Sequence, residues 1–125
     1  MICEEKHAPP GWQGPVFRHT CLSVHVRFPN RPESVLKAFL SSPGAARGFT
    51  ADLVILDEWA FQQYAEEIWA SIFPVVNRPN GGRVIGLSTI RLGTLFEDIF
   101  TNPDNGFHKL FLPWYADPAR DEAWY

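Results

Sequence analysis

Two short runs of apolar residues, separated by a stretch with helical periodicity, dominate the second half of the chain. The first run is Leu53–Leu56, where four consecutive branched apolar residues predict a strand buried on both faces. Apolar positions in residues 61–72 then follow the spacing of one helical face, and Pro74 is expected to end this helix. Residues 83–87, after the turn-forming sequence NRPNGG, predict a second buried strand. Strand, helix and strand in this order favour a parallel crossover.

The remaining patterns are shorter. Residues 92–100 have helical periodicity, and residues 107–112 are a candidate third strand. Alternation over residues 21–28 predicts one strand, whereas residues 33–40 carry mixed signals and fit either a short helix or a strand. The alternation of strands and helices predicts the α/β class, with a parallel sheet flanked by helices.

Composition narrows the class of protein. With 125 residues, of which 46% are hydrophobic, the chain can build one compact core. The net charge of -3 does not provide the basic surface of a free-standing nucleic-acid binder. No apolar run approaches the roughly 20 residues of a membrane span, and the start MICEEKHAPPGW lacks the features of a signal peptide. We therefore expect a soluble, cytoplasmic protein without membrane contact.

Cysteine and histidine residues cluster near the N-terminus. They are Cys3, His7, His19, Cys21 and His25. Their spacing fits no zinc pattern, because the paired, closely spaced ligands of a zinc finger are missing. Two cysteines also do not make a secreted disulfide framework. We interpret these residues as ordinary surface and half-buried side chains.

Polar pairs follow both predicted parallel strands. Asp57 and Glu58 come after the first strand, and Ser88 and Thr89 after the second. Ligands of open parallel sheets bind beyond the carboxyl ends of the strands, so both pairs are expected at one edge. Asp57 suits the water shell of Mg²⁺, and Glu58 suits orientation and deprotonation of an attacking water. On these residues alone, capping of the following helix by the same carboxylates is an equal alternative.

A longer string distinguishes the two interpretations. The sequence ARGFTADLVILDEWAFQQYAEEIW resembles the Walker B region of phage terminase large subunits, the ATP-driven motors that package viral DNA. The similarity continues through GGRVIGLSTIRLGTLFEDIF and on to FLPWYADPARDEAWY, so that it covers residues 41–125. This resemblance implies a partial P-loop NTPase fold.

The resemblance also implies roles for individual residues. Asp57 would be the aspartate associated with Mg²⁺, Glu58 the catalytic glutamate, and Ser88 with Thr89 the sensor that couples the γ-phosphate to domain movement. Arg47 matches a basic position common in the family. The alternative is that Arg47 is a solvated neighbour of a turn at the glycine that follows it. The implied cofactors are ATP and Mg²⁺, and the implied partners are double-stranded DNA, the portal and the small terminase subunit in the bacterial host cytoplasm.

A phosphate-binding loop is missing from these 125 residues. Such a loop needs a lysine after glycine, and none of Lys6, Lys37 and Lys109 follows a glycine. Because that lysine and the loop amides supply most of the charge stabilisation in phosphoryl transfer, we expect the chain alone to hydrolyse ATP negligibly.

The domain organisation expected from these observations has three parts. Residues 1–28 resemble nothing that can be placed, residues 29–112 are the Walker B half of an ATPase domain, and residues 113–125 are a linker cut short before a nuclease domain. A truncated or split gene is the simplest explanation, and an open apolar sheet edge favours self-association. Two alternatives stay open: an interaction module that completes an ATPase with a separate polypeptide carrying the phosphate loop, and a divergent helicase-like nucleotide hydrolase.

Overall fold

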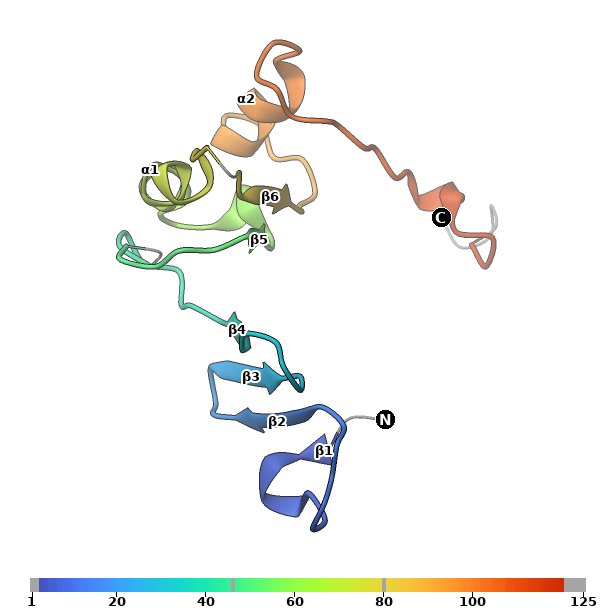
Figure 1. Ribbon diagram of the computed structural model, residues 1–125. Coiled ribbons are helices and arrows are strands. Elements are labelled where there is room, and N and C mark those ends of the chain that lie inside the picture. The colour runs from blue at the N-terminus through green and yellow to red at the C-terminus, as the bar shows by residue number, and fades with distance from the viewer. Residues whose placement is uncertain (1–2, 46, 80, 121–125) are drawn as a thin grey trace.

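The computed structural model describes residues 3–45, 47–79 and 81–120, and its strands form two separate sheets (Figure 1). The elements in chain order are β1 (Cys3–Glu4), η1 (Glu5–His7), β2 (Val16–His19), β3 (Ser23–Arg27), β4 (Ser34–Lys37), β5 (Leu53–Leu56), η2 (Trp59–Phe61), α1 (Ala65–Val76), β6 (Arg83–Gly86), α2 (Leu95–Thr101) and η3 (Trp114–Ala116). The fold is therefore mixed α/β. Within these described residues, no helix has the length and apolar character needed to cross a membrane.

The N-terminal sheet has the strand order β1-β2-β3-β4. Strand β1 is parallel to β2, and the other two pairs are antiparallel. Strand β3 confirms the strand predicted within residues 21–28, and β4 shows that the ambiguous residues 33–40 contain a strand. Strands β1 and β2 were not predicted, because the VFRH of β2 has two apolar residues followed by two polar ones and so lacks alternation.

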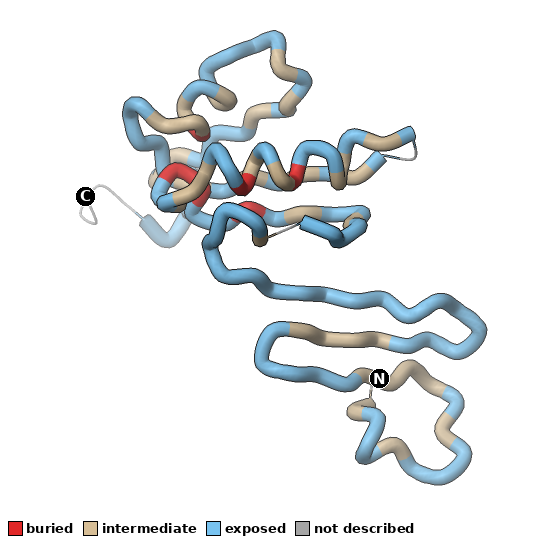
Figure 2. The backbone as a smooth tube through the Cα atoms, turned by 90° about the vertical axis from the view of Figure 1, so that its left-hand side faces the viewer, coloured by how far each residue is buried: buried red, intermediate tan, exposed pale blue. Residues whose placement is uncertain are grey.

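This N-terminal sheet is a single layer with two different faces. Partners in an antiparallel pair point to the same side, so the register separates a polar face from an apolar face. The mainly polar face carries Arg18, His25, Arg27 and Lys37 beside Val16, Ser23 and Val35, and the mainly apolar face carries Phe17, Val24, Val26 and Leu36 beside His19 and Ser34. No described residue of the sheet is buried, and Figure 2 shows the whole sheet as exposed or intermediate.

The C-terminal unit is built on a β5–α1–β6 crossover. Strands β5 and β6 are parallel and in register from Leu53 opposite Arg83 to Leu56 opposite Gly86. This confirms the predicted parallel crossover. It also restricts the parallel sheet to two strands among the described residues, whereas the sequence predicted a third.

The prediction that β5 and β6 are buried on both faces is wrong. Side chains on one face reach the core, as at Leu56, whereas Ile55 on the other face is 54% exposed. Strand β6 alternates between exposed and half-buried residues in the same way. The reason is that helical cover lies on one face only within the described part of the chain, so every second apolar side chain has no layer to pack against.

The predicted helix at residues 61–72 differs in both of its bounds. A short 3-10 helix, η2, ends at Phe61, and Gln62 is extended before α1 begins at Ala65. Pro74 does not end α1, which continues to Val76. Because Pro74 lies in the last turn, its missing N–H removes one hydrogen bond near the helix end and leaves the preceding turns intact.

Helix α2 confirms the predicted helix but begins three residues later. Thr94 caps it, because the Thr94 hydroxyl oxygen accepts a hydrogen bond from the Glu97 N–H at 3.3 Å. The Glu97 carboxylate in turn accepts the Gly93 N–H at 2.6 Å. The third strand predicted at residues 107–112 is wrong, since these residues pair with no described strand.

The hydrophobic core lies between the parallel sheet and the helices of the C-terminal unit (Figure 2). Its buried members are Leu56, Trp59, Ala60, Ile68, Ile72 and Phe96. Trp59 is central, with ring centroids 5.4 Å from Trp69 and 6.0 Å from Phe96. The end of the predicted linker, residues 121–125, lies outside the described residues.

Candidate functional site at the carboxyl edge of the parallel sheet

Backbone hydrogen bonds bring the two predicted polar pairs to one edge of the parallel sheet. The Leu87 N–H donates to the Leu56 carbonyl at 2.8 Å, and the Trp59 N–H donates back to the Leu87 carbonyl at 3.0 Å. The turn that carries Asp57 and Glu58 is therefore held against the end of β6. This juxtaposition follows from the parallel register of the two strands.

Ser88 is joined directly to this turn. Its side chain is half-buried, and its hydroxyl oxygen accepts the Ala60 N–H at 3.1 Å. Ala60 is two residues beyond Glu58 and is itself buried in the core. Ser88 is thus tied to the backbone two residues beyond Glu58.

The carboxylates of Asp57 and Glu58 are both exposed. Asp57 Oδ1 accepts the Glu58 N–H at 3.0 Å, and Glu58 makes no side-chain capping bond at the start of η2. Helix α1 begins only at Ala65, seven residues beyond Glu58. No hydrogen bond joins either carboxylate to the first turn of η2 or α1 among the described residues, so side-chain capping does not account for the acidic pair.

The backbone of Glu58 adopts the left-handed conformation, with φ 48° and ψ 41°. This conformation is uncommon for residues other than glycine and costs roughly 1–2 kcal/mol for a residue with a Cβ. The surrounding hydrogen bonds of Trp59 and Ala60 hold it in place. Strained backbone of this kind is concentrated at functional sites.

Replacing Glu58 by glycine is accordingly expected to raise the free energy of unfolding by about 0.5–1 kcal/mol, since glycine relieves the steric cost but is more flexible when unfolded. Urea denaturation followed by circular dichroism measures the change. Glu58→Ala is the matched control, because it removes the carboxylate and retains the Cβ. Equal free energies of unfolding of the glycine and alanine variants would show that the left-handed backbone at residue 58 is not strained.

Gln62 belongs to the site, although the sequence carried no signal for it. Its side-chain N–H donates to the Asp57 carbonyl at 2.8 Å and so closes the turn between β5 and η2. Its buried Oε1 has no partner among the described residues, and neither does the indole N–H of Trp59. A glutamine five residues after an acidic residue is too common a spacing to have indicated this contact.

The other two predicted site residues are less closely tied to this edge. Thr89 is exposed, and no described residue bonds its side chain. Arg47 lies in the loop that leads into the amino end of β5, with its N–H donating to the Gly44 carbonyl at 3.0 Å. Gly48 has a positive φ of 79°, as expected if it supplies a backbone turn beside a solvated Arg47.

No group of three or more His, Cys, Asp and Glu side chains in the described ranges is arranged to hold a metal ion. Both thiols, of Cys3 and Cys21, are free. Comparisons of the chain with models of protein families, with curated proteins and with solved structures found no match. The functional argument therefore rests on the residues and the geometry of this edge.

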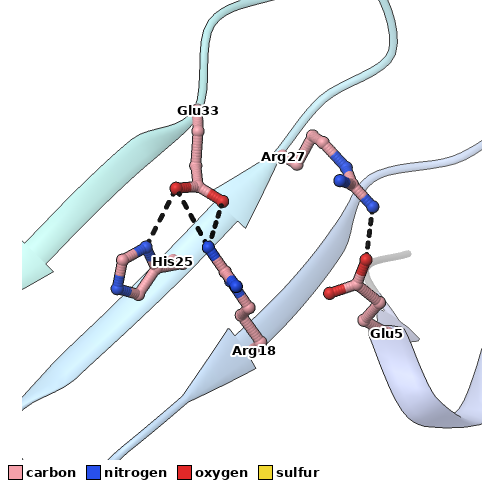
Figure 3. A network of polar contacts seen from close by, with 5 residues as sticks. All are labelled: Glu5, Arg18, His25, Arg27 and Glu33. Carbon is pink, nitrogen blue, oxygen red and sulfur yellow. Dashed lines mark hydrogen bonds and ion pairs between the residues drawn. The ribbon is translucent and has the colours of Figure 1, made fainter.

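A second polar cluster lies on the N-terminal sheet (Figure 3). Glu33 accepts a hydrogen bond from His25 Nδ1 at 3.0 Å and pairs with Arg18 at 3.3 Å. Arg27 pairs with Glu5 on the same side of the sheet. The hydrogen bond from His25, with the nearby charge of Arg18, lowers the pKa of Glu33 below its ordinary value of 4.5.

The stability of the N-terminal sheet is expected to fall in acid. The pKa of Glu33 is lower in the folded state than in the unfolded state. Its ion pair therefore contributes to the stability of the sheet above the unfolded-state pKa, and this contribution is lost as the pH falls through the folded-state pKa. Hydrogen exchange of the β3 and β4 amides between about pH 6 and about pH 3, corrected for intrinsic rates, measures this effect. Glu33→Gln should reduce the dependence of amide protection on pH. If this dependence is unchanged in the variant, the contacts of Glu33 with His25 and Arg18 contribute nothing to the stability of the sheet.

Proposed function

We propose that this chain provides the acidic half of an ATP site, as the Walker B part of a phage terminase large subunit. The observation that carries the proposal is the shared edge of β5 and β6, where Ser88 is hydrogen-bonded into the turn that begins at Asp57 and Glu58. The strained backbone of Glu58 is a second support.

In this proposal, the carboxylate of Glu58 orients the attacking water and accepts its proton. Its left-handed backbone sets the direction in which the side chain leaves the turn. Asp57 fits an Mg²⁺ ion held through its water shell, because one carboxylate oxygen has no described partner and Mg²⁺ keeps several waters. When bound, the ion would neutralise charge on the phosphates.

Ser88 is the proposed link between nucleotide state and movement. Its hydroxyl oxygen accepts the Ala60 N–H, and its O–H has no described acceptor, so it can donate to a phosphate oxygen while the bond to Ala60 is kept. Movement of Ser88 on such a contact would act through this bond on η2 and on the core residue Trp59 behind it. Thr89 is retained in the proposal as an exposed group available to phosphate, whereas Arg47 precedes the amino end of β5, at the opposite end of the strand from Asp57, and fits the solvated turn residue better.

The rest of the site would come from outside these 125 residues. A segment with a phosphate-binding lysine would complete the ATP site, and the assembled motor would act on double-stranded DNA with the portal and the small terminase subunit in the bacterial host cytoplasm. The chain itself lacks such a lysine after glycine. Self-association through its open apolar surfaces is part of the same proposal.

A chimera tests the proposal. Residues 41–112 replace the corresponding segment of a phage terminase large subunit with measurable ATPase activity, and folding is verified by circular dichroism. We expect Mg²⁺-dependent hydrolysis, with Glu58→Gln reducing kcat about a hundredfold because the amide cannot accept a proton. Glu67→Gln, an exposed carboxylate on α1, is the matched control and should leave kcat unchanged. A folded chimera whose activity does not depend on Glu58 would refute the proposal.

A further inference from the structure

A groove runs beside β6, on the side away from β5. It has a volume of about 490 Å³ and is lined by residues 84–90 on one side and residues 107–112 on the other. Trp59 and the α2 residues Phe96, Ile99 and Phe100 also line it. The lining is predominantly apolar and includes β6, which is paired on its other edge with β5.

One wall of the groove is an unpaired strand edge. Alternate residues of a strand direct their N–H and C=O groups to opposite edges. The Arg83 N–H bonds to Asp52 and the Leu87 N–H to Leu56, so these residues face β5. Val84 and Gly86 therefore direct their backbone groups to the groove, and β6 has no second strand partner among the described residues.

The opposite wall is a second segment with unused backbone groups. Among the N–H groups of residues 107–112, that of Phe107 donates to Asn105 Oδ1 at 3.1 Å, and the others have no described acceptor. Phe107 is fixed at one end of the segment, because its ring centroid is 5.7 Å from that of Trp69. The apolar side chains of Leu110 and Leu112 beyond it are exposed.

The volume of the groove is sufficient for a short extended segment. A residue in a sheet fills roughly 160 Å³, from a rise of about 3.3 Å, a spacing of about 4.8 Å and a sheet thickness of about 10 Å. A volume of about 490 Å³ thus corresponds to about three residues of an extended strand. A helix, about 10 Å wide, would leave both rows of backbone groups unbonded.

We infer that this groove accepts an extended apolar β-strand from another polypeptide, which pairs with β6 on one side and with residues 107–112 on the other. Main-chain hydrogen bonds would supply affinity, and the apolar lining would select branched apolar side chains. If the strand runs parallel to β6, the residues after it emerge at the edge that holds Asp57 and Ser88. This last consequence rests on the proposed ATP site, whereas strand binding does not.

The strand β5 already pairs with β6 on its other edge, so its sequence is a suitable probe. A fluorescent peptide, Lys-Lys-Leu-Val-Ile-Leu-Lys-Lys, is titrated with the full chain and followed by anisotropy. We expect saturable binding, slower hydrogen exchange at Val84 and Gly86, and at least about tenfold weaker binding when alternate peptide amides are N-methylated, because those donors are lost.

A matched pair of variants locates the site. The double variant Leu110→Asp, Leu112→Asp removes apolar side chains from the lining of the groove. Because these side chains are 71% and 73% exposed, the fold should persist. Binding of the peptide should weaken about tenfold. Leu92→Asp, at an 81% exposed leucine outside the groove, should leave binding unchanged.

Absence of binding, equal binding of the N-methylated peptide, or protection confined to β1–β4 would overturn the inference. Sedimentation equilibrium tests whether a second copy of the chain occupies the groove. The inference would also be overturned by a dimer that is dissociated by the double substitution Leu110→Asp, Leu112→Asp and is unaffected by the peptide, because the groove would then bind a second copy. Loss of ATPase activity in the chimera affects none of these readouts, so the two proposals fail independently.

Discussion

Replacing Trp59 by alanine is expected to lower the free energy of unfolding of the C-terminal unit by about 4 kcal/mol. The Trp59 side chain is 1% exposed, and its ring packs against the rings of Trp69, Phe96 and Phe107, which come from α1, α2 and the segment after α2. Removal of a large buried aromatic side chain loses its transfer free energy and leaves a cavity, at a cost of about 3–5 kcal/mol. A loss of this size is a large part of the stability of a small domain.

Urea denaturation followed by far-ultraviolet circular dichroism measures this loss. Trp59→Phe is expected to cost far less, about 1 kcal/mol, because it keeps most of the buried ring and removes an indole N–H that has no described acceptor. Tyr115→Ala, at an exposed aromatic residue, is the control and should change stability by less than about 0.5 kcal/mol. A Trp59→Ala loss below about 1.5 kcal/mol would show that Trp59 does not organise the core.

Replacing Gly86 by valine is expected to lower the free energy of unfolding by about 3 kcal/mol. A Cβ at this position would lie 2.5 Å from Cε3 and 2.9 Å from Cζ3 of Trp59, which is closer than carbon atoms approach. Because Trp59 is held by rings on several sides, it cannot move away without further strain, and overpacking of this kind costs roughly 1–3 kcal/mol.

Two comparisons isolate the clash at Gly86. Gly44→Ala is the matched control, because its Cβ would have the Arg47 Cδ as nearest neighbour at 3.7 Å, an ordinary contact. In a Trp59→Leu background, Gly86→Ala should cost at least about 1 kcal/mol less than in the native chain, since the two positions are in contact and their effects are not additive. Equal costs in both backgrounds would place the strain elsewhere.

The candidate site could be predicted in part because its main residues come directly after strands. Apolar runs locate β5 and β6, and a parallel crossover puts the residues after both strands at one edge. Asp57, Glu58 and Ser88 could therefore be assigned together. Gln62 could not, because its contact is with a backbone carbonyl and depends on the path of the turn after β5.

The fold of the N-terminal half could be predicted only at β3. Strand β2 lacks alternation, β1 is two residues long, and β4 was indistinguishable from a short helix. Each of these strands is stabilised by pairing with a neighbouring strand. The register of that pairing depends on both segments and cannot be predicted from either one alone. The separation of the sheet into a polar and an apolar face follows from the register.

The sequence by itself determined the β5–α1–β6 crossover and the placement of Asp57, Glu58 and Ser88 after its strands, because local periodicity and chain connectivity suffice for both. Only the tertiary structure decided that, within the described part of the chain, one face of the parallel sheet is uncovered, that Glu58 is left-handed, and that residues 107–112 form the wall of a groove and not a strand. The physical reason is that burial and strand pairing are properties of two segments at once. An apolar run reports that a strand can be buried, but a second surface must be present to bury it.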